Sequence, residues 1–318
     1  MIVFGPVPSR RLGYSLGINH IPPKNCTYSC VYCQVGRTTH LGTTRRSFYP
    51  INQILQELDA KISESANTGR AIDYLTLVPD GEPTLDINLR KLIKELKRFE
   101  LPIAVISNGS LVDRQDVQED LLLADWVSLK VDAVIEADWH KIDRPHNSLS
   151  LPAILTGMLK FHSGYQGELV TETMLVSGLN DNEPAIHQLC EYLNELKPLK
   201  SYLSIPTRPP AESWVRPPDA DSLQRVFQII SSSNTFMDLL FELENTDFQS
   251  TGNITEDILG ITAVHPIREE ALQNMVSMAH ADWSVVEVLL ASGKIARIQY
   301  REMWFYVRRF ENPNGKVD

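Results

Sequence analysis

The amino-acid sequence predicts an α/β protein built as a (β/α)6 partial TIM barrel, followed by a C-terminal winged helix-turn-helix domain. Three observations support this fold class: the chain has 318 residues, short apolar segments alternate with helical ones from residue 51 onward, and residues 253–311 follow a different order. Apolar strands that alternate with helices are typical of a parallel sheet with right-handed connections. Six units are too few for a closed eightfold barrel, and an ordinary doubly wound sheet is the alternative.

The predicted strands are six apolar segments, most of which are followed by Gly, Pro, Asn or Asp. They span residues 15–21, 72–78, 102–107, 125–132, 167–176 and 201–205. Five helices are predicted between them, at 51–66, 87–99, 113–123, 151–162 and 184–196. The first has apolar residues at helical spacing, namely Ile51, Ile54, Leu55, Leu58 and Ile62. Enzymes of this architecture carry their chemistry at the C-terminal ends of the strands, where polar clusters occur here.

The chain is predicted to consist of a barrel domain at 1–235, a linker at 236–252 and a winged-helix domain at 253–318. The last part reads as three helices and two short strands. Its predicted recognition helix, about 282–292, carries Asp282 and Glu287 and no Lys or Arg. A helix that reads DNA needs cations and donors, so we expect contact with a protein or a substrate instead. Contact with RNA or a carrier partner stays open because the wing is basic, with Lys294, Arg297, Arg301, Arg308 and Arg309 against Glu302. Simple domain packing or dimerisation is a further alternative.

Composition and charge limit the class of protein. Hydrophobic residues make up 43% and charged residues 22%, as in ordinary folded chains. No apolar run approaches the roughly 18 residues that a membrane span needs, so we expect a cytoplasmic protein with no membrane contact. The net charge is −10, yet residues 1–50 contain six Lys or Arg and no Asp or Glu. This stretch suits an anionic cofactor or substrate, and a solvated basic surface is the alternative.

Three of the four cysteines lie in the segment KNCTYSCVYCQ, which follows the first predicted strand. Cys26, Cys30 and Cys33 have the spacing C-x3-C-x2-C, and three thiolates in one loop can bind a multinuclear iron–sulfur centre with one open position. The alternatives are a zinc site completed by His20 or His40, or three unligated thiols. Zinc sites favour paired C-x2-C units or a distant Cys/His pair, which the sequence lacks. The fourth cysteine, Cys190, has the surroundings of a core residue.

This motif resembles that of radical S-adenosylmethionine (SAM) enzymes, in which an aromatic residue, here Tyr32, precedes the third cysteine. The segments FGPVPSRRLGYSLGIN, CVYCQVGRTT, DGEPTL and PTRPPAE are similar to the wyosine-synthetase-like Fe–S oxidoreductase subgroup. The resemblance implies a 4Fe-4S cluster on Cys26, Cys30 and Cys33, with SAM chelating the open iron. It also implies that reductive cleavage of SAM gives a 5′-deoxyadenosyl radical, which abstracts hydrogen from a substrate.

The resemblance further implies which loops meet SAM. The family has a Gly-Gly-Glu motif after the second strand, and this chain has Gly81, Glu82 and Pro83 there, with Asp80 replacing the first glycine. Asn108, after the third strand, matches a polar position that faces SAM. The alternative for the Gly-Glu-Pro segment is a plain turn, and the alternative for Asn108 is a structural residue of a strand-to-helix turn.

Five further polar residues are candidates for the SAM pocket. Ser128, Lys130 and Asp132 alternate along the fourth strand and therefore share one face, from which they could reach the ribose or the carboxylate of SAM. A structural Lys–Asp pair is the alternative. Glu172 is a carboxylate within an apolar strand and so needs a partner. Asn180 lies in a loop that resembles the one holding the adenosine.

The segment PTRPPAESWVRPP, residues 206–218, is predicted to be a stiff lid that faces the substrate, or else an interdomain linker. A radical SAM enzyme requires a low-potential electron donor of flavodoxin or ferredoxin type. It leaves the substrate open, with a tRNA base or a protein partner as candidates that the C-terminal domain would dock. The non-enzymatic alternative is an Fe–S sensor that acts through the winged-helix domain.

Overall fold

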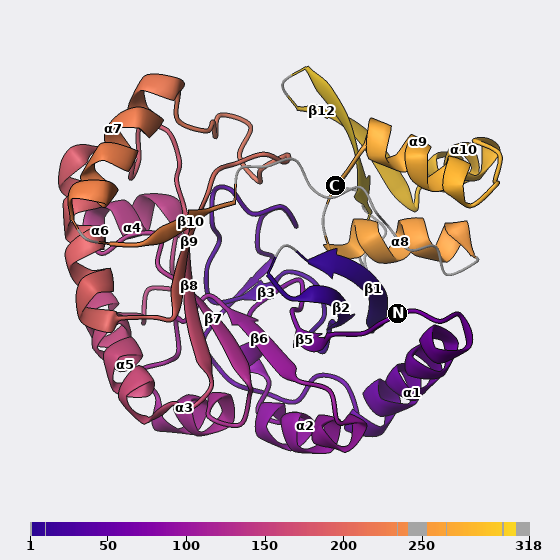
Figure 1. Cartoon of the computed structure of the whole chain (residues 1–318), viewed down its shortest axis with the longest axis horizontal. Helices are drawn as coiled ribbons and strands as arrows, with labels where there is room; N and C mark the ends of the chain where they lie inside the picture. Colours follow the sequence, from indigo (N-terminus) through magenta and orange to yellow (C-terminus); the bar gives the residue numbers. More distant parts are fainter. Residues whose placement is uncertain are drawn as a thin grey trace.

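The structure is a computed structural model of the chain, and it describes residues 2–9, 11–233, 235–240, 253–264, 266–300 and 302–309. Eight strands form one sheet in the order β1-β2-β5-β6-β7-β8-β9-β10 (Figure 1). Their bounds are β1 Val3–Ser9, β2 Gly13–Ile18, β5 Tyr74–Leu77, β6 Ile103–Ser107, β7 Trp126–Lys130, β8 Glu168–Met174, β9 Lys200–Ser204 and β10 Met237–Leu239. A separate two-stranded parallel pair joins β3 (Asn25–Cys26) to β4 (His40–Leu41).

The sheet is parallel from β2 to β10, and only β1 runs antiparallel to its neighbour. The six predicted strands are confirmed as β2, β5, β6, β7, β8 and β9. Within the eight-stranded sheet, the order of the strands in space follows their order in the sequence, without a reversal. A doubly wound sheet requires such a reversal, so that alternative is wrong.

Helices follow the strands and lie together on the outer side of the sheet, where they form an arc (Figure 1). They are α1 Ile51–Asn67, α2 Leu89–Leu96, α3 Gln115–Leu121, α4 Glu136–Ile142, α5 Leu151–Gly164, α6 Glu183–Leu196 and α7 Ala220–Ser232, with two 3-10 turns at Pro83–Leu85 and Lys97–Phe99. All five predicted helices are present within a few residues. The helices α4 and α7 were not predicted, although Val226 and Ile230 of α7 are buried at helical spacing.

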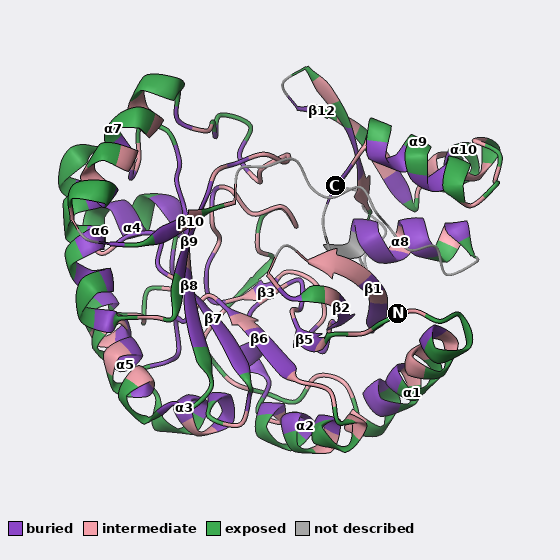
Figure 2. Cartoon of the chain, viewed as in Figure 1, coloured by how far each residue is buried: buried purple, intermediate pink, exposed green. Residues whose placement is uncertain are grey.

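The main core lies between the sheet and this arc of helices. Figure 2 shows the sheet largely buried and each helix buried on the side that faces the sheet. Fully buried side chains come from both layers, for example Leu75 and Leu77 of β5 with Leu89 of α2. Burial on both faces explains why these strands are continuous apolar runs in the sequence.

The C-terminal residues form a second, smaller hydrophobic cluster. In order, its elements are α8 Ile254–Val264, β11 Ile267–Arg268, α9 Glu269–Met278, α10 Ser284–Ala291, β12 Ile295–Tyr300 and β13 Met303–Arg308. The strands pair antiparallel in the order β11-β13-β12. The predicted three helices and two strands are therefore present, with one short strand added. Most of the predicted linker, residues 241–252, lies outside the described residues, so the domain boundaries stay a prediction.

None of the helices in the described ranges is both long enough and apolar enough to cross a membrane.

Candidate active site

The cysteine loop lies at the C-terminal ends of the parallel strands and is held by backbone hydrogen bonds. Cys26 belongs to β3, and Cys30 and Cys33 follow in a turn in which the Cys33 amide donates to the Cys30 carbonyl (3.1 Å). The amide of Ser29 donates to Asp143 and that of Val31 to Ile142, both at 2.9 Å. The end of α4 therefore fixes the path of the chain on both sides of Cys30.

All three cysteines are free thiols that are partly exposed and close enough to influence one another. Burial raises the pKa of Cys26 to about 12, with the charges of Glu82 and Cys33 adding to the effect. Burial also raises the pKa of Cys33, and that of Cys30 well above its usual range. Thiols in such surroundings become thiolates only with a compensating positive charge, which bound metal supplies. The three side chains therefore fit a metal centre as ligands.

The zinc alternative is not supported by the histidines. His20 is buried, with Nε2 3.3 Å from the Pro83 carbonyl oxygen, whereas His40 is exposed on β4. Among the described residues, no three His, Cys, Asp or Glu side chains are placed to share one metal ion. An iron–sulfur cubane spreads its cysteines over separate irons, so its ligands do not have to converge on a single point.

Asn108 lies beside the first cysteine, as the sequence predicts for a residue at the site. Its Nδ2 donates to Thr27 Oγ1 (2.8 Å) and is 3.5 Å from Cys26 Sγ. Its backbone amide donates to Glu82 Oε2 at 2.8 Å. The loop after β6 is thus tied both to the cysteine loop and to the loop after β5.

Glu82 is buried, and both of its carboxylate oxygens already accept hydrogen bonds. Besides the Asn108 amide, the donors are the Thr84 amide (3.0 Å), the Thr84 hydroxyl (2.6 Å) and the Ser107 hydroxyl (2.7 Å). The structure therefore uses this carboxylate to join the β5 and β6 loops. Its predicted contact with SAM stays a prediction.

Gly81 makes a close approach to the strand that carries Cys26. A Cβ atom at Gly81 would lie 2.1 Å from the carbonyl oxygen of Asn25, which accepts a hydrogen bond from the Glu82 amide (3.1 Å). Pro83 is buried and begins the 3-10 turn. Asp80, in place of the family's first glycine, is buried and accepts from Asn19 Nδ2 (2.9 Å). Burial outweighs this hydrogen bond and raises the pKa of Asp80 to about 7.

Lys130, Asp132 and Tyr32 form one cluster. Lys130 Nζ lies 3.4 Å from Asp132 Oδ1 and 5.0 Å from the centre of the Tyr32 ring. The Tyr32 hydroxyl donates to Asp132 Oδ2, and the Met174 amide donates to Asp132 Oδ1 (2.6 Å). The aromatic residue of the cysteine motif thus contacts the end of β7.

Glu172 has the partners that a carboxylate inside an apolar strand requires. It forms ion pairs with Arg11 and with Lys130 (3.5 Å), and Ser204 Oγ donates to it at 3.2 Å. Burial alone would raise the pKa of Glu172, but the charges of Lys130 and Arg11 outweigh it and lower the pKa to about 2. Glu172 is therefore a carboxylate at neutral pH.

Ser128 and Asn180, both predicted to bind SAM, have surroundings that differ from those expected of a SAM-binding residue. Ser128 is buried, and its Oγ has no hydrogen-bond partner among the described residues. The amide of Asn180 is fully engaged, donating to the Asp132 and Met174 carbonyls (2.7 and 2.9 Å) and accepting from the Val176 amide (2.8 Å). Its contact with adenosine stays a prediction.

A cavity of about 590 Å³ opens inside the sheet, next to the cysteine loop. It is lined by residues from seven strands and by Gln34 of the cysteine loop. Its charged lining residues are Arg11, Lys130, Glu172 and Arg208. The volume lies within the range of small-molecule sites, about 300–1,000 Å³.

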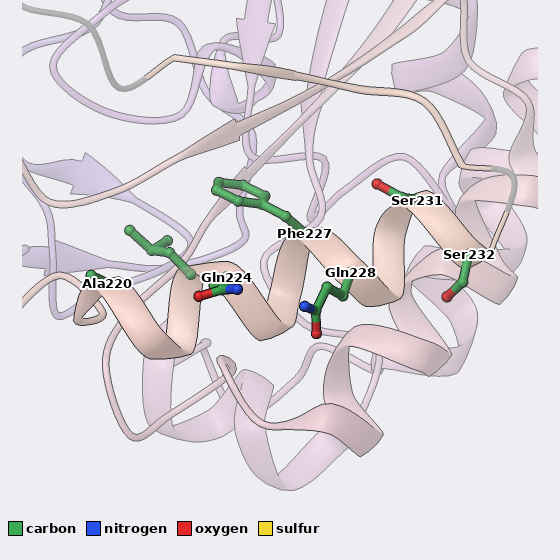
Figure 3. A pocket seen from close by; sticks show the side chains of 7 residues that line it. Ala220, Gln224, Phe227, Gln228, Ser231 and Ser232 are labelled. Carbon is green, nitrogen blue, oxygen red and sulfur yellow. The ribbon is translucent and has the colours of Figure 1, made fainter.

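A second hollow runs along α7, lined by Ala220, Leu223, Gln224, Phe227, Gln228, Ser231 and Ser232 (Figure 3). All of these side chains come from one helix, and none is charged. This surface offers no acid, base or metal ligand.

The segment 206–218 packs on the cysteine loop. Glu212 accepts from Arg37 Nε (3.0 Å) and Nη2 (2.8 Å) and from Arg144 Nη1 (2.5 Å), and its amide donates to the Val31 carbonyl (3.0 Å). Arg208 Nη1 donates to Gln34 Oε1 at 2.8 Å. This segment therefore does more than connect two parts of the chain, because it covers the cysteine loop.

Three residues that contact the predicted site residues were not predicted from the sequence, namely Arg11, Asp143 and Glu212. Asp143 Oδ1 lies 3.3 Å from Cys30 Sγ. Each of the three meets its partner across more than a hundred residues of sequence, so no local pattern marks the pair. An acidic residue within the proline-rich segment was the only available signal for Glu212.

Comparisons with known proteins agree with this site. Residues 21–190 match the Radical SAM superfamily model. The chain is 43% identical to the UPF0026 protein of Methanocaldococcus jannaschii, over 99% of this chain and 98% of that one. It is 35% identical to a UPF0026 protein of Synechocystis, over 65% of this chain and 76% of the other.

Solved structures are similar in fold. A radical SAM methyltransferase from Sphaerobacter thermophilus has a TM-score of 0.56 at 14% identity, over 72% of this chain and 67% of that one. SuiB of Streptococcus suis, bound to SAM, has a TM-score of 0.51 at 11% identity, over 70% and 49% of the two chains. Enzymes of this superfamily use a 4Fe-4S cluster and SAM. The chain therefore belongs to the radical SAM superfamily of enzymes and, within it, to the UPF0026 family.

Proposed function

We propose that Cys26, Cys30 and Cys33 hold the 4Fe-4S cluster and that SAM binds between this loop and the cavity lined by Lys130 and Glu172. The observation that carries the proposal is the presence of three free cysteines in one loop at the C-terminal ends of the parallel strands, next to Gln34, which lines this cavity. Chemistry at that edge of a parallel sheet is typical of barrel enzymes. The fold we infer is the (β/α)6 partial barrel with a winged helix-turn-helix domain at 253–318.

When bound, the cluster and SAM supply a 5′-deoxyadenosyl radical that removes a hydrogen atom from the substrate. The chain's own residues bind SAM and hold it in a fixed orientation. Asn108 lies where it can direct an amide toward the cysteine loop, and Lys130 presents a cation to the carboxylate of SAM. Glu172, held ionised by Arg11, presents acceptors for hydroxyl or amino groups. Segment 206–218 covers the loop and limits access of water.

We infer that the substrate is part of a macromolecule, a tRNA base or a protein segment, docked with help from the C-terminal domain. The cavity of about 590 Å³ is the size of a small-molecule site. On β12, exposed Arg297 pairs with Glu269 and lies 4.1 Å from the centre of the Trp304 ring. Free cysteines suit a reducing compartment, so we place the enzyme in the cytoplasm. The sensor alternative is less favoured, because α10 carries Glu287 and no Lys or Arg.

The test is an assay for 5′-deoxyadenosine on anaerobically reconstituted protein with dithionite and SAM. We expect slow formation by the parent chain and none by Cys30→Ala. Cys190→Ala is the matched control, because Cys190 is buried in α6 and lies outside the cysteine loop. An intact cluster that neither cleaves SAM nor changes its spectrum on SAM addition would contradict the proposal and favour the sensor.

A further inference from the structure

A positively charged rim borders the cysteine loop on the protein surface. The basic rim consists of Lys24, Arg37 and Arg144, with Trp214 beside them. The side chains of Arg37 and Arg144 are 71% and 42% exposed although both are ion-paired with Glu212. Lys24 joins them because its Nζ would be 3.8 Å from a Cβ atom placed on Gly36.

The charge of this rim is not cancelled locally. In the part of the chain that the structure describes, the ion pairs of Arg37 and Arg144 both go to Glu212, whose side chain is 7% exposed. Hydrogen bonds from Arg37, together with Arg144, lower the pKa of Glu212, so it stays a carboxylate. Two exposed guanidinium groups thus share one carboxylate, and Lys24 adds a third cation near Gly36, on a protein whose net charge is −10.

The rim lies within a few residues of the cluster ligands. Arg144 directly follows Asp143, whose Oδ1 is 3.3 Å from Cys30 Sγ. Arg37 is close in sequence to Cys33, whose carbonyl accepts from the Gly36 amide at 3.2 Å. A protein bound to the rim would therefore approach the cysteine loop by a short path.

Trp214 gives the rim an apolar contact. It is 47% exposed, which is unusual for so large a side chain, and it lies two residues after Glu212. Tryptophan and arginine are the residues most enriched at the centres of protein–protein interfaces. The combination favours a protein over a small ion as the partner.

We propose that the basic rim is the docking surface for a small acidic electron-carrier protein that reduces the cluster. The inference rests on the proposed function, since it assumes the cluster on the cysteine loop. In the docked complex the carrier is oxidised by one electron and the cluster is reduced by one. Complementary charge mainly speeds encounter, and brief contacts over a small interface are typical of electron-transfer complexes. RNA is less favoured as the partner, because RNA gains its affinity from many phosphate contacts and the basic rim has only Lys24, Arg37 and Arg144 to make them.

The test compares two reductants on the same reconstituted protein. Stopped-flow absorbance gives the rate of cluster reduction by a reduced flavodoxin and by dithionite. A change in the cluster loop itself would alter both rates, so the ratio of the two rates reports on flavodoxin docking alone. The variants are Arg37→Gln with Arg144→Gln, and Trp214→Ser. Arg98→Gln is the matched control, because Arg98 is an arginine of similar exposure (44%) that pairs with Asp59 on another surface.

We expect the double variant to lower the flavodoxin-to-dithionite ratio about 10-fold at low ionic strength, with recovery toward the parent ratio in high salt. Binding of oxidised flavodoxin, measured by surface plasmon resonance, should weaken in parallel, and Arg98→Gln should change neither quantity. An unchanged ratio would overturn the inference. The inference would also be overturned if the double variant lost RNA binding while its flavodoxin-to-dithionite ratio stayed the same as that of the parent. Either result leaves SAM cleavage with dithionite, and hence the proposed function, intact.

Discussion

Gly81→Ala should separate the loop after β5 from the strand that carries Cys26. The new Cβ atom would lie 2.1 Å from the Asn25 carbonyl oxygen, whereas ordinary contact begins at 3.4 Å, so the two backbones must part by about 1.3 Å. Overpacking of this kind costs about 1–3 kcal/mol, and loss of the hydrogen bond from the Glu82 amide adds about 1 kcal/mol. We expect a total loss of about 2–4 kcal/mol and a lower cluster content, because Asn25 directly precedes a ligand.

Urea denaturation of the apoprotein measures the loss in stability, and iron and sulfide content after anaerobic reconstitution measures the effect on the cluster. Gly164→Ala is the control, since a Cβ atom there meets nothing within 4 Å and the residue has no positive φ. If Gly81→Ala matched this control in both measurements, the close approach to Asn25 would not be the reason for glycine at that position.

Two further predictions concern buried carboxylates. Because the pKa of Asp80 rises from 3.8 to about 7 on folding, the folded state loses stability as pH rises between these values, by about 4 kcal/mol at most. Asp80→Asn, which keeps an acceptor for Asn19, should therefore raise the melting temperature of the apoprotein at pH 8 and change it little at pH 4; a pH-independent effect would refute this. Glu172→Gln should destabilise the fold by about 3–5 kcal/mol at pH 7, since it leaves Lys130 and Arg11 without their shared carboxylate. The pKa of Glu172 is lowered from 4.5 to about 2, so this difference should shrink as pH falls through that range, and equal stability at pH 7 would contradict the ion-pair account.

The strands were predictable because their environment imposes a simple pattern. A parallel strand buried on both faces must be apolar throughout, and β5 (YLTL) and β6 (IAVIS) are short runs of this kind followed by turn residues. β1 was missed because VFGPVPS contains two prolines and a glycine, which an edge strand tolerates but a central strand does not.

The cysteine motif was recognisable because its three cysteines are neighbours in the chain, whereas the residues that contact the cysteine loop are distant in sequence. Arg11 meets Glu172 across 161 residues, and Arg37 meets Glu212 across 175, and nothing in either local segment identifies the other. Glu82 illustrates the opposite difficulty. The sequence predicts Glu82 as a SAM-binding residue, but only the structure reveals that Thr84, Ser107 and Asn108 already donate hydrogen bonds to its oxygens.

The supports of the cysteine loop come from distant parts of the chain, and this sets an order of events during synthesis. The three thiols leave the ribosome long before Asp143 and Glu212, the side chains that contact Cys30 and cover the loop. At about 5–20 residues per second, the thiols wait roughly 10–35 s for the segment that carries Glu212. During that interval they are unprotected thiols that oxygen or stray metal can reach. The cysteine loop is therefore complete only after the sheet has grown past β9 and the segment that carries Glu212 has been made.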